Sequence, residues 1–122
     1  MLLDSDIMVN ILRGVPDAVA WMAAAGPVAL PGLVVMELMQ GCRSMADQRR
    51  MEARIRHFDI HWPTAADCAR AYADFAAHRL GRGLGLLDAL IGQTAVGLDE
   101  PLETFNVKHF SVVSGLTIVW PY

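Results

Sequence analysis

Two acidic residues stand alone in long apolar stretches, and they are the first candidates for chemistry. Residues 18–42 carry one charge, Glu37, and residues 83–98 carry one charge, Asp88, in a chain whose residues are 19% charged. This depletion predicts that both stretches are largely buried. An unpaired buried carboxylate costs free energy, so each of these acids requires a partner or a function.

A third acid, Asp4, follows the apolar pair Leu2–Leu3, and Asp6 lies two residues further on. Carboxylates that converge from distant parts of a chain repel one another unless a divalent cation neutralises them. A ligand set of hard oxygens without His or Cys selects Mg²⁺ or Mn²⁺. Such an ion activates water against a phosphodiester. We therefore expect Asp4, Glu37 and Asp88 to hold one metal site.

Each acid also has a structural interpretation. Asp4 can cap the helix that follows it, and Asp6 suits the positive end of that helix. Glu37 can pair with a buried arginine, and Asp88 can cap the helix after the glycine-rich loop at 81–85. These alternatives stay open for each acid taken singly, but a structural role for all three at once is the less favoured interpretation.

The elements that must position these acids alternate between strand and helix. Apolar periodicity, capping residues and the Gly and Pro positions predict strands at 2–3, 28–30, 58–62, 102–105 and 117–120. They predict helices at 5–13, 16–25, 31–40, 44–56, 64–80 and 86–96, with a turn or short helix at 106–110. This order favours an α/β sandwich with a mainly parallel sheet, in which sites form beyond the carboxyl ends of the strands. With 122 residues and no linker, we expect one domain spanning 1–122.

Composition argues against several other classes. Cys42 and Cys68 form neither a CxxC motif nor a Cys/His cluster, so a zinc site is not expected. No apolar run reaches the roughly 18 residues of a membrane span, and acids at the N-terminus are unlike a signal peptide. We expect a cytoplasmic protein with reduced thiols. The net charge of −3 means that RNA binding would depend on a local basic patch or a metal.

Four short blocks occur in the order typical of PIN-domain ribonucleases. They are LLDSDI at 2–7, VMELMQG at 35–41, LDALIGQTA at 87–95 and TFNVKHF at 104–110. No single block is specific, but at these intervals the four resemble the VapC toxins of VapBC toxin–antitoxin modules over essentially the whole chain. The resemblance implies a three-layer α/β/α sandwich and an endoribonuclease that depends on Mg²⁺ or Mn²⁺.

The resemblance also assigns roles by position. Asp4, Glu37 and Asp88 match the acids that bind the metal and carry catalysis. The family often has a fourth acid in the last block, where this chain has Asn106, also a candidate catalytic residue. An uncharged amide is a weaker ligand, which argues against a second tightly bound metal.

Other polar residues are candidates for supporting roles. Asp6 lies where the family often has Asn and partly restores the missing charge, and Thr104 matches a hydroxyl that orients the site. Arg79 and Arg82 flank the glycine-rich loop and are candidate RNA contacts, whereas the basic stretch at 49–57 is interpreted as a solvated helix face. The histidines without partners at ligand spacing are interpreted as structural or surface residues: His61, His78 and His109.

The resemblance implies partners as well. It implies a homodimer with an RNA substrate, inhibited by a cognate VapB-type antitoxin whose Arg or Lys reaches into the acids from a groove. One alternative is a PIN-like binding module without catalysis, which only Asn106 supports. Another is a haloacid-dehalogenase-like phosphatase, suggested by the spacing of Asp4 and Asp6. That motif usually has Thr or Val where this chain has Met8. The phosphatase family also needs a lysine, and Lys108 is the only lysine in this chain.

Overall fold

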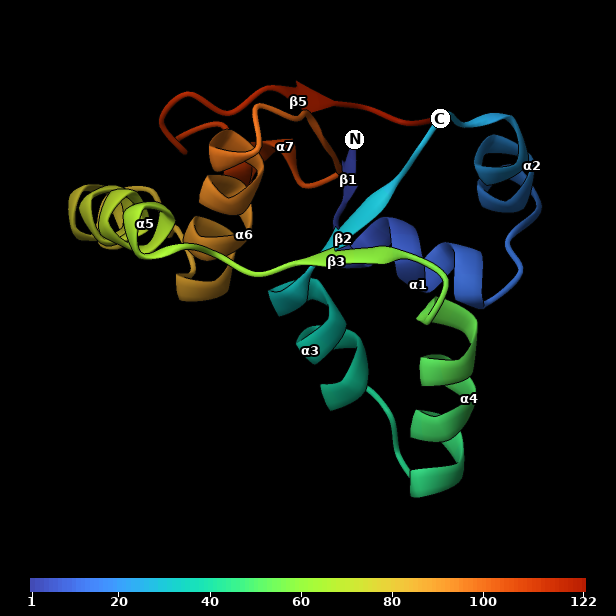
Figure 1. Ribbon diagram of the computed structural model, residues 1–122. Coiled ribbons are helices and arrows are strands. Elements are labelled where there is room, and N and C mark those ends of the chain that lie inside the picture. Colours follow the sequence, from blue (N-terminus) through green and yellow to red (C-terminus); the bar gives the residue numbers. More distant parts are fainter.

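Five short parallel strands form the centre of the computed structural model, which describes residues 1–122 (Figure 1). Their order across the sheet is β3-β2-β1-β4-β5, so the first strand lies in the middle. Leu2 pairs with Ala29 on one side and with Leu102 on the other. The strands are β1 (Leu2–Leu3), β2 (Ala29–Pro31), β3 (Asp59–His61), β4 (Leu102–Glu103) and β5 (Ile118–Val119). The predicted parallel sheet is confirmed, although four of its strands are shorter than predicted or shifted.

Seven helices cover the sheet and complete the three-layer sandwich. In Figure 1, α5 and α6 lie together on one side, and α1, α2 and α4 lie on the other. Thr64 caps α5 in a capping box: its side chain accepts the backbone N–H of Asp67, and the Asp67 side chain accepts the backbone N–H of Thr64. The helices are α1 (Ser5–Leu12), α2 (Pro16–Ala24), α3 (Gly32–Gln40), α4 (Met45–Ile55), α5 (Ala65–His78), α6 (Leu86–Gly97) and α7 (Val107–Phe110).

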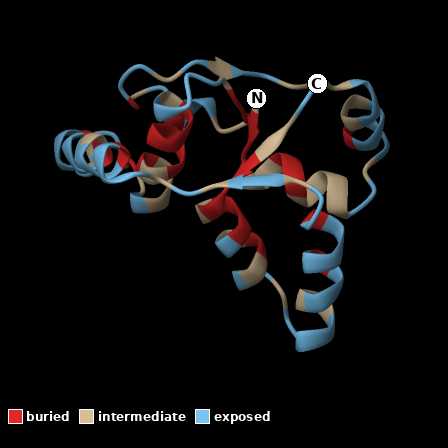
Figure 2. Cartoon of the chain, viewed as in Figure 1, coloured by how far each residue is buried: buried red, intermediate tan, exposed pale blue.

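The hydrophobic core surrounds the central strands, and the helices that contribute most of its residues are α3 and α6, with smaller contributions from α1, α4 and α5 (Figure 2). The prediction from charge depletion is confirmed for α3 and α6, since most of their residues are buried or half-buried. It is wrong for α2, whose only buried residue is Ala18. An alanine-rich helix lacks charges without being covered, so missing charge alone does not show burial. Within α2, Trp21 is half-buried against Tyr122 at the C-terminus.

The edge strand β3 also differs from its prediction. Alternation at 58–62 predicts a half-buried strand, but the side chains of Ile60 and Trp62 are 39% and 56% exposed. An edge strand has a neighbour on one side only, and here the helices leave part of it uncovered. Trp62 lies directly over Gly32, where an added Cβ would come within 2.3 Å of the ring. Glycine at that position therefore allows α3 to begin close to the sheet.

No single helix is long and apolar enough to cross a membrane; α1 and α2, bent by 108° at their break, reach that length and composition only when counted together.

Candidate functional site

The site begins where the two central strands end. Asp4 follows β1 directly, and Thr104 follows β4, its parallel neighbour. The backbone N–H of Asp4 donates to the carbonyl of Glu103 at 3.0 Å, so the ladder continues to the end of both strands. This register brings the two side chains together. The Thr104 hydroxyl donates to Asp4 Oδ2 at 2.8 Å, and both residues are buried.

Asp6, in the first turn of α1, holds the segment that follows β4. Its Oδ2 accepts the backbone N–H of Phe105 at 3.0 Å and lies 3.4 Å from the Thr104 hydroxyl. The backbone N–H of Asn106 donates to Thr104 Oγ1 at 2.9 Å. Asp4, Asp6, Thr104 and Asn106 therefore belong to one hydrogen-bonded group, although their segments are about a hundred residues apart.

Glu37 and Asp88 reach the same region from α3 and α6, which pack against each other. The charges of Asp88 and Asp6 both raise the pKa of Glu37, after burial, which is the largest cause. Glu37 makes no ion pair, so its alternative role as the partner of a buried arginine is not seen. Asp88 accepts no backbone hydrogen bond and therefore does not cap α6. Asp4 does cap α1, with Oδ1 accepting the N–H of Ser5 at 2.8 Å.

The acids are held in an environment that resists their ionisation. The pKa of Asp4 is raised from 3.8 to about 7, mainly by burial and also by the charges of Asp6 and Glu37, while the hydrogen bonds from Thr104 and Ser5 act in the opposite direction. Burial likewise raises the pKa values of Asp6 and Asp88. Such grouped shifts in carboxylates are typical of functional sites.

The donor atoms present suit a divalent cation. Asp6 Oδ1 and Glu37 Oε1 are buried without any hydrogen-bond partner, which is costly for anionic oxygens unless a cation satisfies them. No three His, Cys, Asp or Glu side chains lie close enough to enclose one ion, so the acids form an electrostatic group and not a closed ligand shell. Mg²⁺ is usually bound through one or two carboxylates and keeps several waters. The residues therefore fit a hydrated Mg²⁺ or Mn²⁺.

The structure gives His109 partners that the sequence analysis missed. Its Nδ1 lies 3.6 Å from Asp88 Oδ2 and 3.1 Å from the side-chain nitrogen of Asn106. The available signal was its position three residues after Asn106, which is the residue that precedes the short helix α7. The interpretation of His109 as a residue without partners is therefore corrected.

The basic residues are less closely tied to the acids. Arg79 and Arg82 are exposed between α5 and α6, and their side chains form no ion pair or hydrogen bond. Within the basic stretch at 49–57, Arg50 pairs with Asp47, and Arg54 donates to the carbonyl of Leu12. Part of that stretch therefore stabilises the fold.

A groove of about 560 Å³ opens beside the acids, between α1, α3 and α4. Glu37 lies on its wall and connects it with the acidic group. Arg13 also lines it and is the basic side chain of this groove. The other lining residues are mostly apolar or small: Ser5, Val9, Leu12, Leu38, Gly41, Cys42, Asp47 and Met51.

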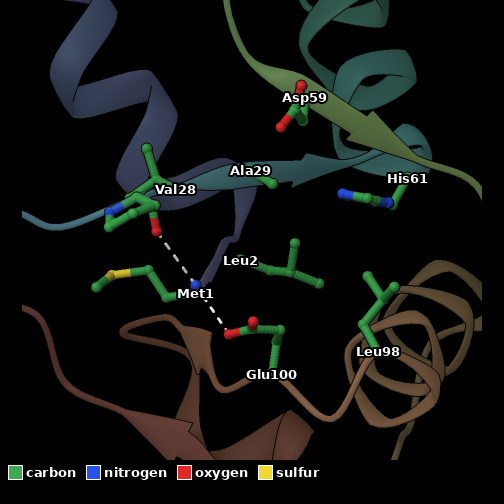
Figure 3. A pocket seen from close by; sticks show the side chains of 9 residues that line it. Met1, Leu2, Val28, Ala29, Asp59, His61, Leu98 and Glu100 are labelled. Carbon is green, nitrogen blue, oxygen red and sulfur yellow. Dashed lines mark hydrogen bonds and ion pairs between the residues drawn. The ribbon is translucent and has the colours of Figure 1, made fainter.

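A second cavity, of about 240 Å³, lies at the opposite, amino edge of the sheet (Figure 3). Asp59, His61 and Glu100 line it together with the chain's terminal ammonium group. Glu100 pairs with that ammonium group at 3.0 Å, so part of the charge is already neutralised. Ligand sites of open α/β sheets lie beyond the carboxyl ends of the strands, which favours the acid group at Asp4 over this cavity.

Known proteins share both the sequence and the fold. The PIN domain family matches residues 1–116. Ribonuclease VapC10 of Mycobacterium tuberculosis is 33% identical over 95% of this chain and 90% of its own length, and Ribonuclease VapC19 of the same organism is 32% identical over 94% and 95%. These matches set the phosphatase alternative aside.

Solved structures agree. A toxin–antitoxin complex from Klebsiella pneumoniae contains a chain with a TM-score of 0.80 and 28% identity, covering 99% of this chain and 97% of that one. A chain of VapBC-1 from nontypeable Haemophilus influenzae has the same fold, with a TM-score of 0.79 and 21% identity over 97% and 95% of the two chains. This chain belongs to the PIN-domain family and, within it, to the VapC group.

Proposed function

We propose that this chain is a VapC-type toxin, an endoribonuclease that hydrolyses RNA phosphodiester bonds with Mg²⁺ or Mn²⁺ and is inhibited by a VapB-type antitoxin. The observation that carries the proposal is the group of four coupled acids, Asp4, Asp6, Glu37 and Asp88, with two buried oxygens left unpartnered. Such a group is unfavourable at neutral pH unless a cation binds to it. The names of the relatives, both ribonucleases, supply the substrate class.

The chain's own residues would divide the work at the site. When bound, the metal would supply a water of lowered pKa and would stabilise negative charge on the phosphodiester. Asp4, Glu37 and Asp88 would hold it, one or two of them directly and the rest through its waters. Thr104 keeps Asp4 Oδ2 in one orientation through its hydroxyl. Asp6 anchors the segment after β4 through the N–H of Phe105 and adds negative charge beside Asp4.

The groove between α1, α3 and α4 is where we expect the antitoxin to bind. Its apolar lining, including Val9, Leu12 and Met51, suits the apolar face of a peptide segment, and an Arg or Lys of that segment would meet Glu37. The complexes of related chains with antitoxins support this partner. An RNA substrate would place the activity in the cytoplasm.

A homodimer is the expected assembly. Tyr72 and Leu86 are 76% and 59% exposed, and they border an entirely apolar groove between α5 and α6. Exposed apolar patches of this kind mark interaction surfaces. A second copy of the chain would cover the patch.

An RNA cleavage assay tests the proposal. The wild type should cut RNA with added Mg²⁺ or Mn²⁺ and stop in excess EDTA. Asp4→Asn should lose cleavage while remaining folded, whereas Asp17→Asn, on the exposed face of α2, should cut normally. Full activity in EDTA would contradict the metal mechanism. A folded wild type that binds Mn²⁺ but cuts no RNA would favour a binding module.

A further inference from the structure

Two of the four acids, Glu37 and Asp88, accept no hydrogen bond, and of these two only Asp88 has a basic side chain beside it. Asp4 is held by Thr104 and Ser5, and Asp6 is held by the backbone of Phe105. The carboxylate of Asp88 accepts no hydrogen bond, and the polar group beside it is the imidazole of His109, with Nδ1 at 3.6 Å from Oδ2. His109 is therefore the side chain that is placed to orient this carboxylate.

His109 lies on a backbone segment that is anchored to the core. The next residue, Phe110, is completely buried and anchors α7, which packs against α6. The ring nitrogen Nδ1 also lies 3.1 Å from the side-chain amide of Asn106, whose backbone N–H is bonded to Thr104. A chain of contacts thus runs from Asp4 through Thr104, Asn106 and His109 to Asp88, and joins the end of β1 to the start of α6.

The chemistry of the ring suits a carboxylate. The amide of Asn106 can turn either its nitrogen or its oxygen toward the ring, because the two ends have the same shape. The negative charge of Asp88 favours the tautomer with a proton on Nδ1. If Asn106 turns its oxygen toward the ring, the one Nδ1–H lies between two acceptors, the Asn106 oxygen and the Asp88 carboxylate, and is shared between them. At 3.6 Å the ring is beyond hydrogen-bond distance from Asp88. A small rotation of either side chain would close the contact, since both are partly exposed.

We propose that His109 is a positioning residue for Asp88, which holds its carboxylate in the orientation that binds the divalent cation. The proposal rests on the metal site of the proposed function and adds a residue to it. His109 would not touch the metal. Partners that orient a ligating carboxylate typically contribute about 10-fold to 100-fold to metal affinity.

Titration calorimetry with MnCl₂ and with MgCl₂ tests this role. His109→Ala should lower the affinity for both ions by about 10-fold or more, with the same factor for each. Its melting temperature in EDTA should match that of the wild type. His109→Asn places an amide near the former Nδ1 and should restore most of the affinity. Asn106→Ala removes the side chain that contacts the ring, and it should also lower the affinity for both ions. The matched control is His57→Ala, an exposed residue in the turn after α4, which should bind both ions as the wild type does.

Three outcomes separate the alternatives. Unchanged affinity in His109→Ala, with a wild type that binds, would overturn the positioning role alone. Loss of Mn²⁺ affinity with Mg²⁺ unaffected would mean that the imidazole ligates the ion directly, and would also overturn it. A folded wild type that binds neither ion would instead refute the metal site of the proposed function, and with it this inference.

Discussion

The hydroxyl of fully buried Thr104 donates a 2.8 Å hydrogen bond to Asp4 Oδ2, although the two residues are 100 positions apart in the sequence. The hydroxyl oxygen of Thr104 also accepts the backbone N–H of Asn106 at 2.9 Å, so one side chain connects the ends of both central strands. Asp4 is thereby kept in place although burial opposes its charge. The stability and the activity of the protein should both depend on this hydroxyl.

Thr104→Val should destabilise the protein and reduce cleavage. The substitution keeps the shape but leaves Asp4 Oδ2 and the N–H of Asn106 without a partner, which should lower the free energy of unfolding by about 1–3 kcal/mol. Thr104→Ser should retain both properties. The control is Thr94→Val, which removes a buried hydroxyl bonded only to the carbonyl of Leu90 in α6. Denaturant unfolding and RNA cleavage rates measure the two effects, and equal stability of Thr104→Val and wild type would contradict the role.

The stability of the protein in EDTA should fall as the pH rises from 5 to 8. Unfolded Asp4 titrates near 3.8 and folded Asp4 near 7, so between these values the folded state binds the extra proton. The free energy of unfolding then decreases by up to about 1.4 kcal/mol per pH unit for this group. Asp4→Asn should remove this part of the slope and be as stable as the wild type, or more so, at pH 8. If the free energies of unfolding of the two proteins changed in parallel with pH, the pKa of Asp4 would be an ordinary one.

Gln93→Leu should destabilise the protein without a specific effect on the site. Gln93 is completely buried and donates to Asp74 at 2.6 Å and to the carbonyl of Ser114 at 3.0 Å, while its oxygen accepts from Arg70 at 2.8 Å. Leucine leaves these buried groups short of partners, which should cost about 2–4 kcal/mol. Cleavage per folded molecule at low temperature should match the wild type. A loss of cleavage in fully folded Gln93→Leu would mean that this network also shapes the site.

Arg79 and Arg82 should contribute to RNA affinity and not to folding. Both are exposed and free of ion pairs, so replacing both with alanine should leave the melting temperature unchanged. If they contact phosphates, KM should rise for every RNA sequence. The slope of the logarithm of the binding constant against the logarithm of the salt concentration should also become shallower by about one for each lost contact. The control is the pair Arg49→Ala and Arg56→Ala, both exposed on α4. An unchanged KM in the first pair would rule out the contact.

The sequence alone predicted the order of the elements, and it did so from local signals. The helix cap at Thr64, the glycines after α5 and the apolar pair at Leu2–Leu3 each act within a few residues, and each is found in the structure. Asp4, Glu37 and Asp88 were identified because a charge in an apolar stretch is costly wherever that stretch is buried. That argument needs no knowledge of the neighbours, and it failed in α2, where the missing charges reflect alanine content and not burial.

Only the tertiary structure decided which groups meet. The contact of Asp4 with Thr104 depends on the register of β1 and β4, which are separated by most of the chain. The approach of His109 to Asp88 depends on how α7 packs against α6, and the exposure of Ile60 depends on the edge position of β3. The energy of these contacts comes from pairs of distant segments, and a local pattern carries no information about the partner. The acids could therefore be identified from the chain, and Thr104 and Asp6 from the family resemblance, whereas the contacts that join them and the place of His109 became visible only in the folded protein.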